Sequence, residues 1–339
     1  MTTASSVQEP VGSARPVGAA RSAPPGRRAR RRPGPDVISL FAIFLVLPLG
    51  IFLVFVLWPL LQAISYSFTN WSGFSAAMDV VWFDNYVRLA QDDIFLKAVG
   101  NNVKLAVLIP ITILTLSLAL AIMVTVGGAS HGRTKGLAGA GFYRVVSFFP
   151  YTIPAVAAGL MFTLVMDPNN GLVNGALTRL GFQSFQHFPW LGDSRTAMPV
   201  MMSVMVWSLV GFYMVLFIAA IKGIPSEIFE AARIDGAGRL RTAVSITLPL
   251  IRENVQTAYI YLGIAAIDMY VYAQSMFPFG GPENTTLTMS QHLMSTALTK
   301  GQFGIACAMG VVMGVLTMGF AALVFLVNRL TGGKERVVL

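Results

Sequence analysis

The sequence is poor in the residues that build metal sites and disulfides: it has one cysteine, Cys307, and three histidines among 339 residues. A single cysteine excludes an intramolecular disulfide and a zinc cluster built on cysteines, so we expect no metal and no cofactor. Charge is scarce too. Charged residues make up 12% of the chain and hydrophobic residues 55%, whereas a soluble domain carries about 25% charged residues. The composition therefore excludes an ordinary soluble protein.

Catalytic signatures are also missing. The sequence contains no G-x-x-x-x-G-K-[ST] phosphate-binding loop, so the chain cannot hydrolyse a nucleotide by that route. It also offers no Ser/His/Asp set and no pair of carboxylates in a soluble domain. We predict that the chain has no catalytic residues and is not an enzyme.

Residues 1–36 differ from the rest in composition, with proline, glycine, alanine, serine and seven arginines. Nothing in this stretch could bury a core, so we predict a disordered, basic cytoplasmic tail. A cleaved signal peptide is the competing interpretation. The apolar run that starts at Val37 and extends to about Ala63 is too long for it, because a signal peptide's apolar region has roughly 7–15 residues.

Six segments have the length and polarity of membrane spans, since a spanning helix needs about 20 mainly apolar residues. They cover approximately residues 38–63, 101–126, 146–166, 196–221, 255–277 and 303–328. We therefore predict an all-α membrane protein. Its six-helix domain occupies residues 37–330, and a cytoplasmic tail occupies residues 331–339.

Lysine and arginine placement predicts the orientation. With the amino terminus inside, 18 of the 24 lysines and arginines fall on cytoplasmic segments. Both termini and the loop 222–254 are then cytoplasmic. The net charge of +9 is thus explained by topology, and nucleic-acid binding becomes a remote alternative.

A charged, glycine-broken segment, EAARIDGAGRLRTAVSITLP, occupies residues 230–249 between the fourth and fifth predicted spans. Pro225 favours a helix start before it, and Glu227 in the first turn suits the positive end of the helix dipole. Gly236 allows a tight reversal. We expect a short helix roughly parallel to the bilayer, with small side chains that let another surface approach closely. The alternative is an amphipathic helix that rests on lipid head groups.

The same segment looks like the EAA motif, which marks inner-membrane permease subunits of binding-protein-dependent ABC importers. The matching positions are Glu230, Ala231, Ala232, Gly236, Ile246, Leu248 and Pro249. The fuller string is similar to the carbohydrate branch, the maltose-type permeases. The resemblance covers roughly residues 38–330.

Other stretches resemble the same family: FDNYVRL at 83–89, FFPYTIPAVAAGLMFTLVMDPNNGLVNGAL from Phe148, PWLGD at 189–193, VWSLVGFYMVLF at 206–217, and Asp268 with Gly280-Gly281-Pro282 and Thr286. The sequence departs from the family pattern near Asp268. Ile267 precedes this aspartate, and Phe277-Pro278-Phe279 replaces the usual LTG-type approach.

The resemblance implies a type I importer permease in the bacterial cytoplasmic membrane. The EAA residues would couple the spans to a cytoplasmic ATPase dimer, which is a separate polypeptide. The chain would pair with a second permease, giving a heterodimer, and receive sugar from an extracellular solute-binding protein through the outer loops 64–100, 167–195 and 278–302. Alternating access would move the sugar.

Polar and aromatic residues inside the spans are candidates for the sugar path. A carboxylate inside a membrane should face a cavity or a partner. The candidates are Asp268, Tyr272, Gln274, Trp207 and Tyr213. In the alternative interpretation, Asp268 is satisfied by a neighbouring helix or by the partner permease, and the aromatic residues serve packing.

Two other classes of protein would show different sequence features. An ion-coupled secondary transporter predicts several buried charges and an internal repeat of broken helices, whereas the sequence shows one clear intramembrane carboxylate and no obvious repeat. A membrane enzyme or scaffold predicts catalytic clusters. The sequence leaves the sugar open among malto-oligosaccharides, aminosugars such as N-acetylglucosamine or its dimer, other disaccharides and glycerol phosphates.

Overall fold

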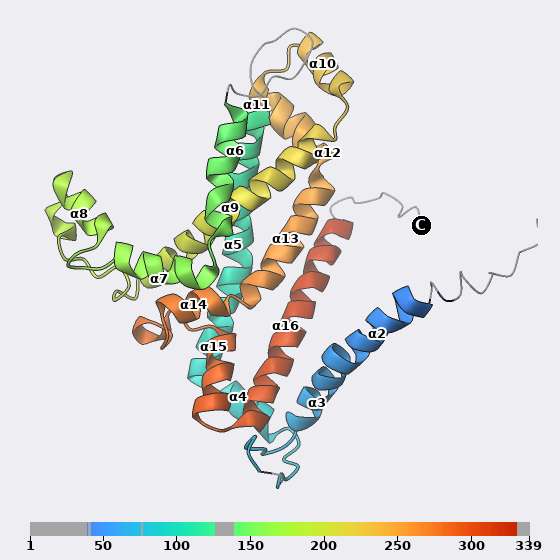
Figure 1. Cartoon of the computed structure of the whole chain (residues 1–339), viewed down its shortest axis with the longest axis vertical. Helices are drawn as coiled ribbons and strands as arrows, with labels where there is room; N and C mark the ends of the chain where they lie inside the picture. The colour runs from blue at the N-terminus through green and yellow to red at the C-terminus, as the bar shows by residue number, and fades with distance from the viewer. Residues whose placement is uncertain (1–38, 40–41, 76, 126–138, 331–339) are drawn as a thin grey trace, which may run out of the picture. The chain divides into compact units, whose positions relative to one another are not determined.

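The computed structural model describes residues 39, 42–75, 77–125 and 139–330 (Figure 1). The predicted tails 1–36 and 331–339 lie outside the described residues. Within those ranges the chain is helical, and its one β-type contact is an isolated antiparallel bridge between Thr69 and Val80. The all-α architecture predicted from the composition is confirmed.

The chain divides into two units, residues 1–57 and residues 58–339. The described part of the first unit contains α2 (Leu47–Phe52), flanked by π-wound turns at Ala42–Val46 and Leu53–Leu57. The helices of the second unit are α3 (Trp58–Tyr66), α4 (Asp84–Gln91), α5 (Asp93–Thr125), α6 (Ala140–Phe148), α7 (Ala155–Val165), α8 (Leu172–Arg179), α9 (Ala197–Lys222), α10 (Ser226–Ile234), α11 (Arg239–Thr242), α12 (Leu248–Leu250), α13 (Arg252–Ile267), α14 (Tyr270–Met276), α15 (Met289–Met294) and α16 (Phe303–Leu330).

The core of the second unit lies where α5, α9 and α13 pack together. Its fully buried side chains include Ile109 from α5, Phe217 from α9 and Leu262 from α13. Gly211 lets α6 and α9 approach closely, because a Cβ at this position would lie 1.7 Å from the main-chain oxygen of Ser147. Small residues at helix contacts are the usual means of close packing in membranes, where the hydrophobic effect does not drive helices together.

Three π-wound turns each end two residues before a proline. The turns at 42–46, 53–57 and 243–247 precede Pro48, Pro59 and Pro249. Proline has no N–H to donate to the preceding turn and its ring crowds the carbonyl there. A wider turn accommodates both effects, so the prolines explain why these helices are locally unwound.

Four helical stretches are long and apolar enough to span a membrane in the described part of the chain: Ile43–Tyr66, Asp93–Thr125, Ala197–Lys222 and Phe303–Leu330. They match four of the six predicted segments. A fifth candidate is the pair Gly141–Thr152 and Ala155–Val165, which is bent by 95°. The exact number of six spans is therefore not confirmed.

The predicted span at 146–166 is bent in the structure. Residues Phe149–Thr152 form a 3-10 turn with Pro150 near its start, and Pro154 lies in extended backbone before α7. The predicted span at 255–277 is interrupted, because α13 ends at Ile267 and α14 begins only at Tyr270.

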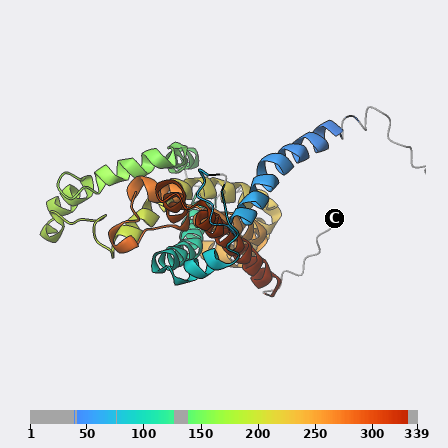
Figure 2. The same cartoon turned by 90° about the horizontal axis from the view of Figure 1, so that it is seen from below.

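The two ends of the helix bundle carry different elements. In Figure 1 the short helices α10 and α11 lie at the end where α9 stops and α13 starts, while α4 and α15 lie at the opposite end. Figures 1 and 2 both show α8 extending away from α16, at the end of α7. The candidate coupling segment and the predicted outer loops 64–100 and 278–302 thus lie at opposite ends of the second unit, whereas α8 of the loop 167–195 lies to one side.

Candidate functional site

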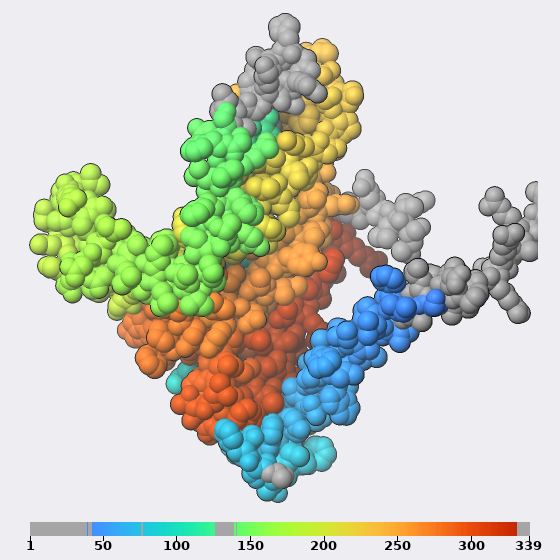
Figure 3. Space-filling view, viewed as in Figure 1, coloured from blue at the N-terminus to red at the C-terminus, as the bar shows by residue number. Residues whose placement is uncertain are grey.

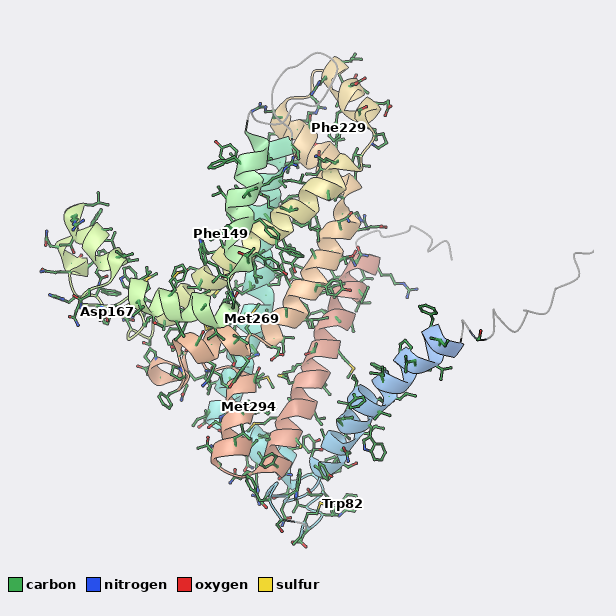
Figure 4. All side chains as sticks on the ribbon, in the orientation of Figure 1. Trp82, Phe149, Asp167, Phe229, Met269 and Met294 are labelled. Carbon is green, nitrogen blue, oxygen red and sulfur yellow. The ribbon has the colours of Figure 1, made fainter. Side chains whose placement is uncertain are left out.

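The segment between α9 and α13 folds into the predicted short helix. Pro225 precedes it with φ −54° and ψ 138°, and α10 follows from Ser226. Phe229 and Ala232 are three residues apart, so they lie on one helix face, and both are buried. Phe229, labelled in Figure 4, belongs to the main hydrophobic core. This buried face fixes α10 to the end of the bundle.

Gly236 terminates α10 in a left-handed conformation with φ +72°. Its N–H donates to the main-chain oxygen of Arg233 at 3.0 Å, and the N–H of Ala237 donates to that of Ala232 at 2.9 Å. These two bonds form the Schellman arrangement, in which glycine is favoured because other residues pay about 1–2 kcal/mol for a left-handed backbone. A Cβ at Gly236 would meet nothing within 4 Å. Glycine is therefore required at this position by its positive φ and not by a lack of room for a side chain.

The second half of the motif returns the chain to α13. The hydroxyl of Thr247 donates to the main-chain oxygen of Thr242 at 3.2 Å, and Thr247 is fully buried. Ile246 and Leu248 on either side of it are half-buried, whereas Pro249 is exposed. The apolar residues of the motif therefore anchor the return, and the proline sets the π-wound turn before it.

The outward face of the same segment has no cover in the described chain. Glu230 and Ala231 are exposed, and two large apolar side chains, Ile234 and Leu240, are 87% and 79% exposed. The space-filling view shows α10 at the surface at this end of the bundle (Figure 3). Exposed apolar side chains beside small ones are typical of a surface that receives a partner.

Asp268 lies in the break between α13 and α14, next to Met269, which Figure 4 labels. Its side chain is exposed, and its Oδ1 accepts a hydrogen bond from the Ser290 hydroxyl at 3.1 Å. A neighbouring helix thus supplies one partner to the carboxylate, as the packing alternative requires. The exposed remainder of the carboxylate is open to a solute.

Gln274 joins the same surroundings from α14. Its Oε1 accepts a hydrogen bond from the Nε2 of Gln291 at 3.1 Å, and that Nε2 also donates to the main-chain oxygen of Phe277 at 2.8 Å. Gln291 directly follows the Ser290 that binds Asp268. Asp268 and Gln274 therefore bind two adjacent residues of α15, Ser290 and Gln291.

The three predicted aromatic residues lie elsewhere. Tyr272 is 8% exposed and packs in the main core. Trp207 packs edge-to-face against Phe162 with ring centroids 5.1 Å apart. Tyr213 lines a cavity of about 520 Å³ between α9 and α13, together with Phe212. The five candidates therefore do not converge on one pocket.

Sequence reasoning missed the residues that close the helix break. The side-chain amide of Asn102 donates to the main-chain oxygen of Ile267 and accepts from the N–H of Met289 at 2.8 Å. Its neighbour Asn101 donates to the main-chain oxygens of Asn284 and Leu287, both at 3.0 Å. Two adjacent asparagines near the start of a predicted span were the signal available in the sequence.

The end of the unit opposite α10 carries a contact of the buried His292. His292 of α15 approaches Asp92, between α4 and α5, with Nε2 3.3 Å from Oδ2. Partial burial acts to raise the pKa of Asp92, but hydrogen bonds from the main-chain N–H groups of Phe95 and Ile94, together with His292, outweigh it. The pKa of Asp92 therefore lies below its ordinary value of 3.8.

Residues 117–333 match the family "Binding-protein-dependent transport system inner membrane component", and the chain belongs to this family. It is thus a translocation component of the inner membrane that works with a binding protein. The permease and its fold, predicted from the EAA motif, are confirmed, and membership in the family favours an importer over an ion-coupled transporter.

Two relatives in sequence and one solved structure are similar to this chain over most of its length. The diacetylchitobiose uptake system permease protein NgcF of Streptomyces coelicolor is 57% identical over 323 residues, which cover 95% of this chain and 91% of that protein. The multiple sugar-binding transport system permease protein MsmF of Streptococcus mutans is 30% identical over 276 residues, covering 80% and 89%. A bacterial alginate ABC transporter, crystallised with its alginate-bound periplasmic protein, contains a chain with the same fold: the TM-score is 0.72 at 20% identity, covering 89% of this chain and 98% of that one.

Proposed function

We propose that this chain moves an N-acetylglucosamine disaccharide, or a carbohydrate of closely similar chemistry, across the inner membrane. The relative at 57% identity is named for diacetylchitobiose uptake and matches this chain over nearly its full length. A more distant relative is named for multiple sugars. Both names support a carbohydrate as the transported solute. The name of the relative at 57% identity supports an acetylated aminosugar in particular.

We base the proposed coupling of the spans to an ATPase on one observation: α10 has one buried face and one exposed face. Phe229 and Ala232 bind the bundle, while Glu230 and Ala231 face outward. An ATPase that grips the outward face would shift the inward face with it, because packed helices move as rigid bodies rather than deforming. The two ends of the segment continue into α9 and α13, so such a movement reaches the spans.

The proposed assembly follows from this arrangement. A separate ATPase dimer binds the α10 end in the cytoplasm, and a second, different permease completes the membrane portion. The extracellular binding protein contacts the opposite end through the loops 64–100, 167–195 and 278–302. Both termini are cytoplasmic in this proposal, consistent with 18 of 24 lysines and arginines on that side.

The proposed sugar path runs along α9 and α13. The cavity beside Tyr213 is also lined by four polar residues of α13: Glu253, Asn254, Thr257 and Tyr261. Three of these are spaced by four residues and lie on one helix face. Among the residues that the structure describes, none of these four side chains forms a hydrogen bond with another protein group. Polar groups of this kind inside a membrane protein mark a solute pathway, with Asp268 and Gln274 farther along α13 and α14.

Uptake by the reconstituted assembly tests this function. The chain, its partner permease, the ATPase and the binding protein are placed in proteoliposomes, and uptake of labelled diacetylchitobiose is measured with and without ATP. We expect ATP-dependent uptake that maltose does not displace. Maltose-specific uptake would contradict the substrate, and uptake driven by an ion gradient without the ATPase would contradict the importer.

Variants of the same assembly test the path. Thr257→Val and Tyr213→Leu should lower uptake by about tenfold or more, since a lost hydrogen bond or ring contact in a desolvated site costs on the order of 1–2 kcal/mol. Thr112→Val is the control, because the Thr112 hydroxyl is bonded to its own helix at Leu108. Equal uptake by all three variants would remove this cavity from the path.

A further inference from the structure

A second cavity, on a different face of α13, is not used by the transport proposal. It has a volume of about 580 Å³ and lies between α5, α13 and α16. Figure 1 shows α13 and α16 running side by side. Gln256 and Tyr259 of α13 line this cavity, whereas Thr257 and Tyr261 line the other one. The two cavities therefore occupy separate faces of one helix.

The lining of this cavity is apolar for most of its length. Val103 and Val107 come from α5, Val255 from α13, and Phe320 and Val324 from α16. Arg252 and Ile267, the first and last residues of α13, both line it. At 1.5 Å per residue the cavity follows the helix for about 22 Å. One leaflet of a bilayer has roughly 15 Å of hydrocarbon, so an extended acyl chain fits the length.

One end of the cavity is polar and basic. Arg252, Gln256 and Asn328 line it there. Arg252 and Gln256 are four residues apart, so they lie on the same face of α13. The guanidinium of Arg252 donates to Oδ1 of Asn328 at 3.4 Å, a long bond that leaves most of its donors for another acceptor. Among the described residues, Arg252 forms no salt bridge.

We propose that this cavity binds an anionic phospholipid. The acyl chain occupies the apolar length between α5, α13 and α16, and the phosphate lies at Arg252 and Gln256. Guanidinium groups bind phosphate with two parallel hydrogen bonds, and basic pockets between membrane helices on the cytoplasmic side bind anionic head groups. The orientation proposed above assigns the lipid to the cytoplasmic leaflet; the site itself does not depend on the sugar.

The site lies where a lipid can influence transport. Leu248 of the EAA segment lines the same cavity as Arg252, and only α12 and Ile251 separate the π-wound turn at 243–247 from α13. A bound lipid would hold the return of the coupling segment against α16. We therefore expect the lipid to raise ATP-driven uptake in the assembled transporter.

The test counts lipids on the intact transporter. The complex is purified from membranes, exchanged into mild detergent with phosphatidylglycerol, and examined by native mass spectrometry. We expect the wild type to retain one more phosphatidylglycerol than Arg252→Gln and one more than Val324→Trp, which fills the cavity without changing charge. In vesicles of phosphatidylcholine alone, wild-type uptake should fall at least threefold compared with vesicles containing one quarter phosphatidylglycerol.

Two matched variants control for charge and bulk. Arg329→Gln removes an exposed arginine one residue beyond Asn328, and Val315→Trp adds bulk to an exposed position of α16; neither residue lines the cavity. Both should retain the lipid. Equal lipid counts in all five proteins would overturn the proposal.

A photo-crosslinking amino acid at Val324 distinguishes the occupants. A lipid adduct on this subunit is expected. An adduct to the partner permease would mean that a helix of that subunit fills the cavity, and the lipid site would then be wrong. Sugar uptake by the wild type is measured in the same preparation. A failed lipid test with normal uptake would then count against the lipid site alone and not against the transport proposal.

Discussion

The side chain of Asn102 donates a hydrogen bond to the main-chain oxygen of Ile267, the last residue of α13. The same amide group accepts a hydrogen bond from the N–H of Met289 at 2.8 Å, and Asn102 is 1% exposed. The break between α13 and α14 leaves main-chain groups that the helix itself cannot pair. One buried asparagine of α5 therefore joins the last residue of α13 to the first residue of α15, beside Asp268.

Replacing Asn102 tests this arrangement. In Asn102→Leu the oxygen of Ile267 and the N–H of Met289 are left buried and unpaired, at a cost of about 1–3 kcal/mol each. We expect the purified transporter to unfold at a temperature several degrees lower. Asn169→Leu, at an exposed turn position, should leave the unfolding temperature unchanged. A wild-type melting curve for Asn102→Leu would show that water or another group satisfies the break.

The two glycines of the coupling segment make a matched pair. Gly236 has φ +72°, while Gly238 has φ −69° and open space around it. Gly236→Pro should abolish uptake with the protein still in the membrane, because proline removes the N–H that bonds Arg233 and cannot adopt a positive φ. Gly238→Ala should retain uptake. Similar uptake by both variants would contradict a requirement for the left-handed turn.

The contact between Asp92 and His292 predicts a pH dependence. The pKa of Asp92 is lower in the folded protein than its ordinary value, so its contribution to stability is fully present above that ordinary value and is lost as the pH falls through the folded pKa. We expect the melting temperature to fall as the pH drops below the ordinary carboxylate pKa of about 3.9. Asp92→Asn, whose amide does not ionise, should lose less stability in that pH range. Identical pH profiles for the two proteins would assign the acid sensitivity to other carboxylates.

The sequence predicted those elements that depend on local patterns. The spans at 196–221 and 303–328 agree with α9 and α16 within two residues, because long apolar runs determine both ends. The EAA segment also folded as predicted, since Pro225 and Gly236 set its start and end by backbone chemistry. Its coupling role stays a prediction.

Elements that depend on distant contacts were not predictable in the same way. The amide of Asn102 and the carbonyl of Ile267 are 165 residues apart, so no window of local sequence reveals that α13 is interrupted there. The second predicted span begins at Asp93 rather than residue 101, because the polar residues before Asn101 continue the helix beyond the apolar run. The cavity beside Tyr213 likewise follows from the packing of α9 on α13.

The most direct test of the account is contact between Ala231 and the ATPase. A photo-crosslinking amino acid is placed at Ala231 in the assembled transporter, with Thr299, an exposed residue near the opposite end, as the control position. We expect an adduct with the ATPase from Ala231, changing in yield when ATP is added, and none from Thr299. The account would be contradicted if Ala231 gave no such adduct, or if a membrane-impermeant reagent labelled that position from outside intact cells.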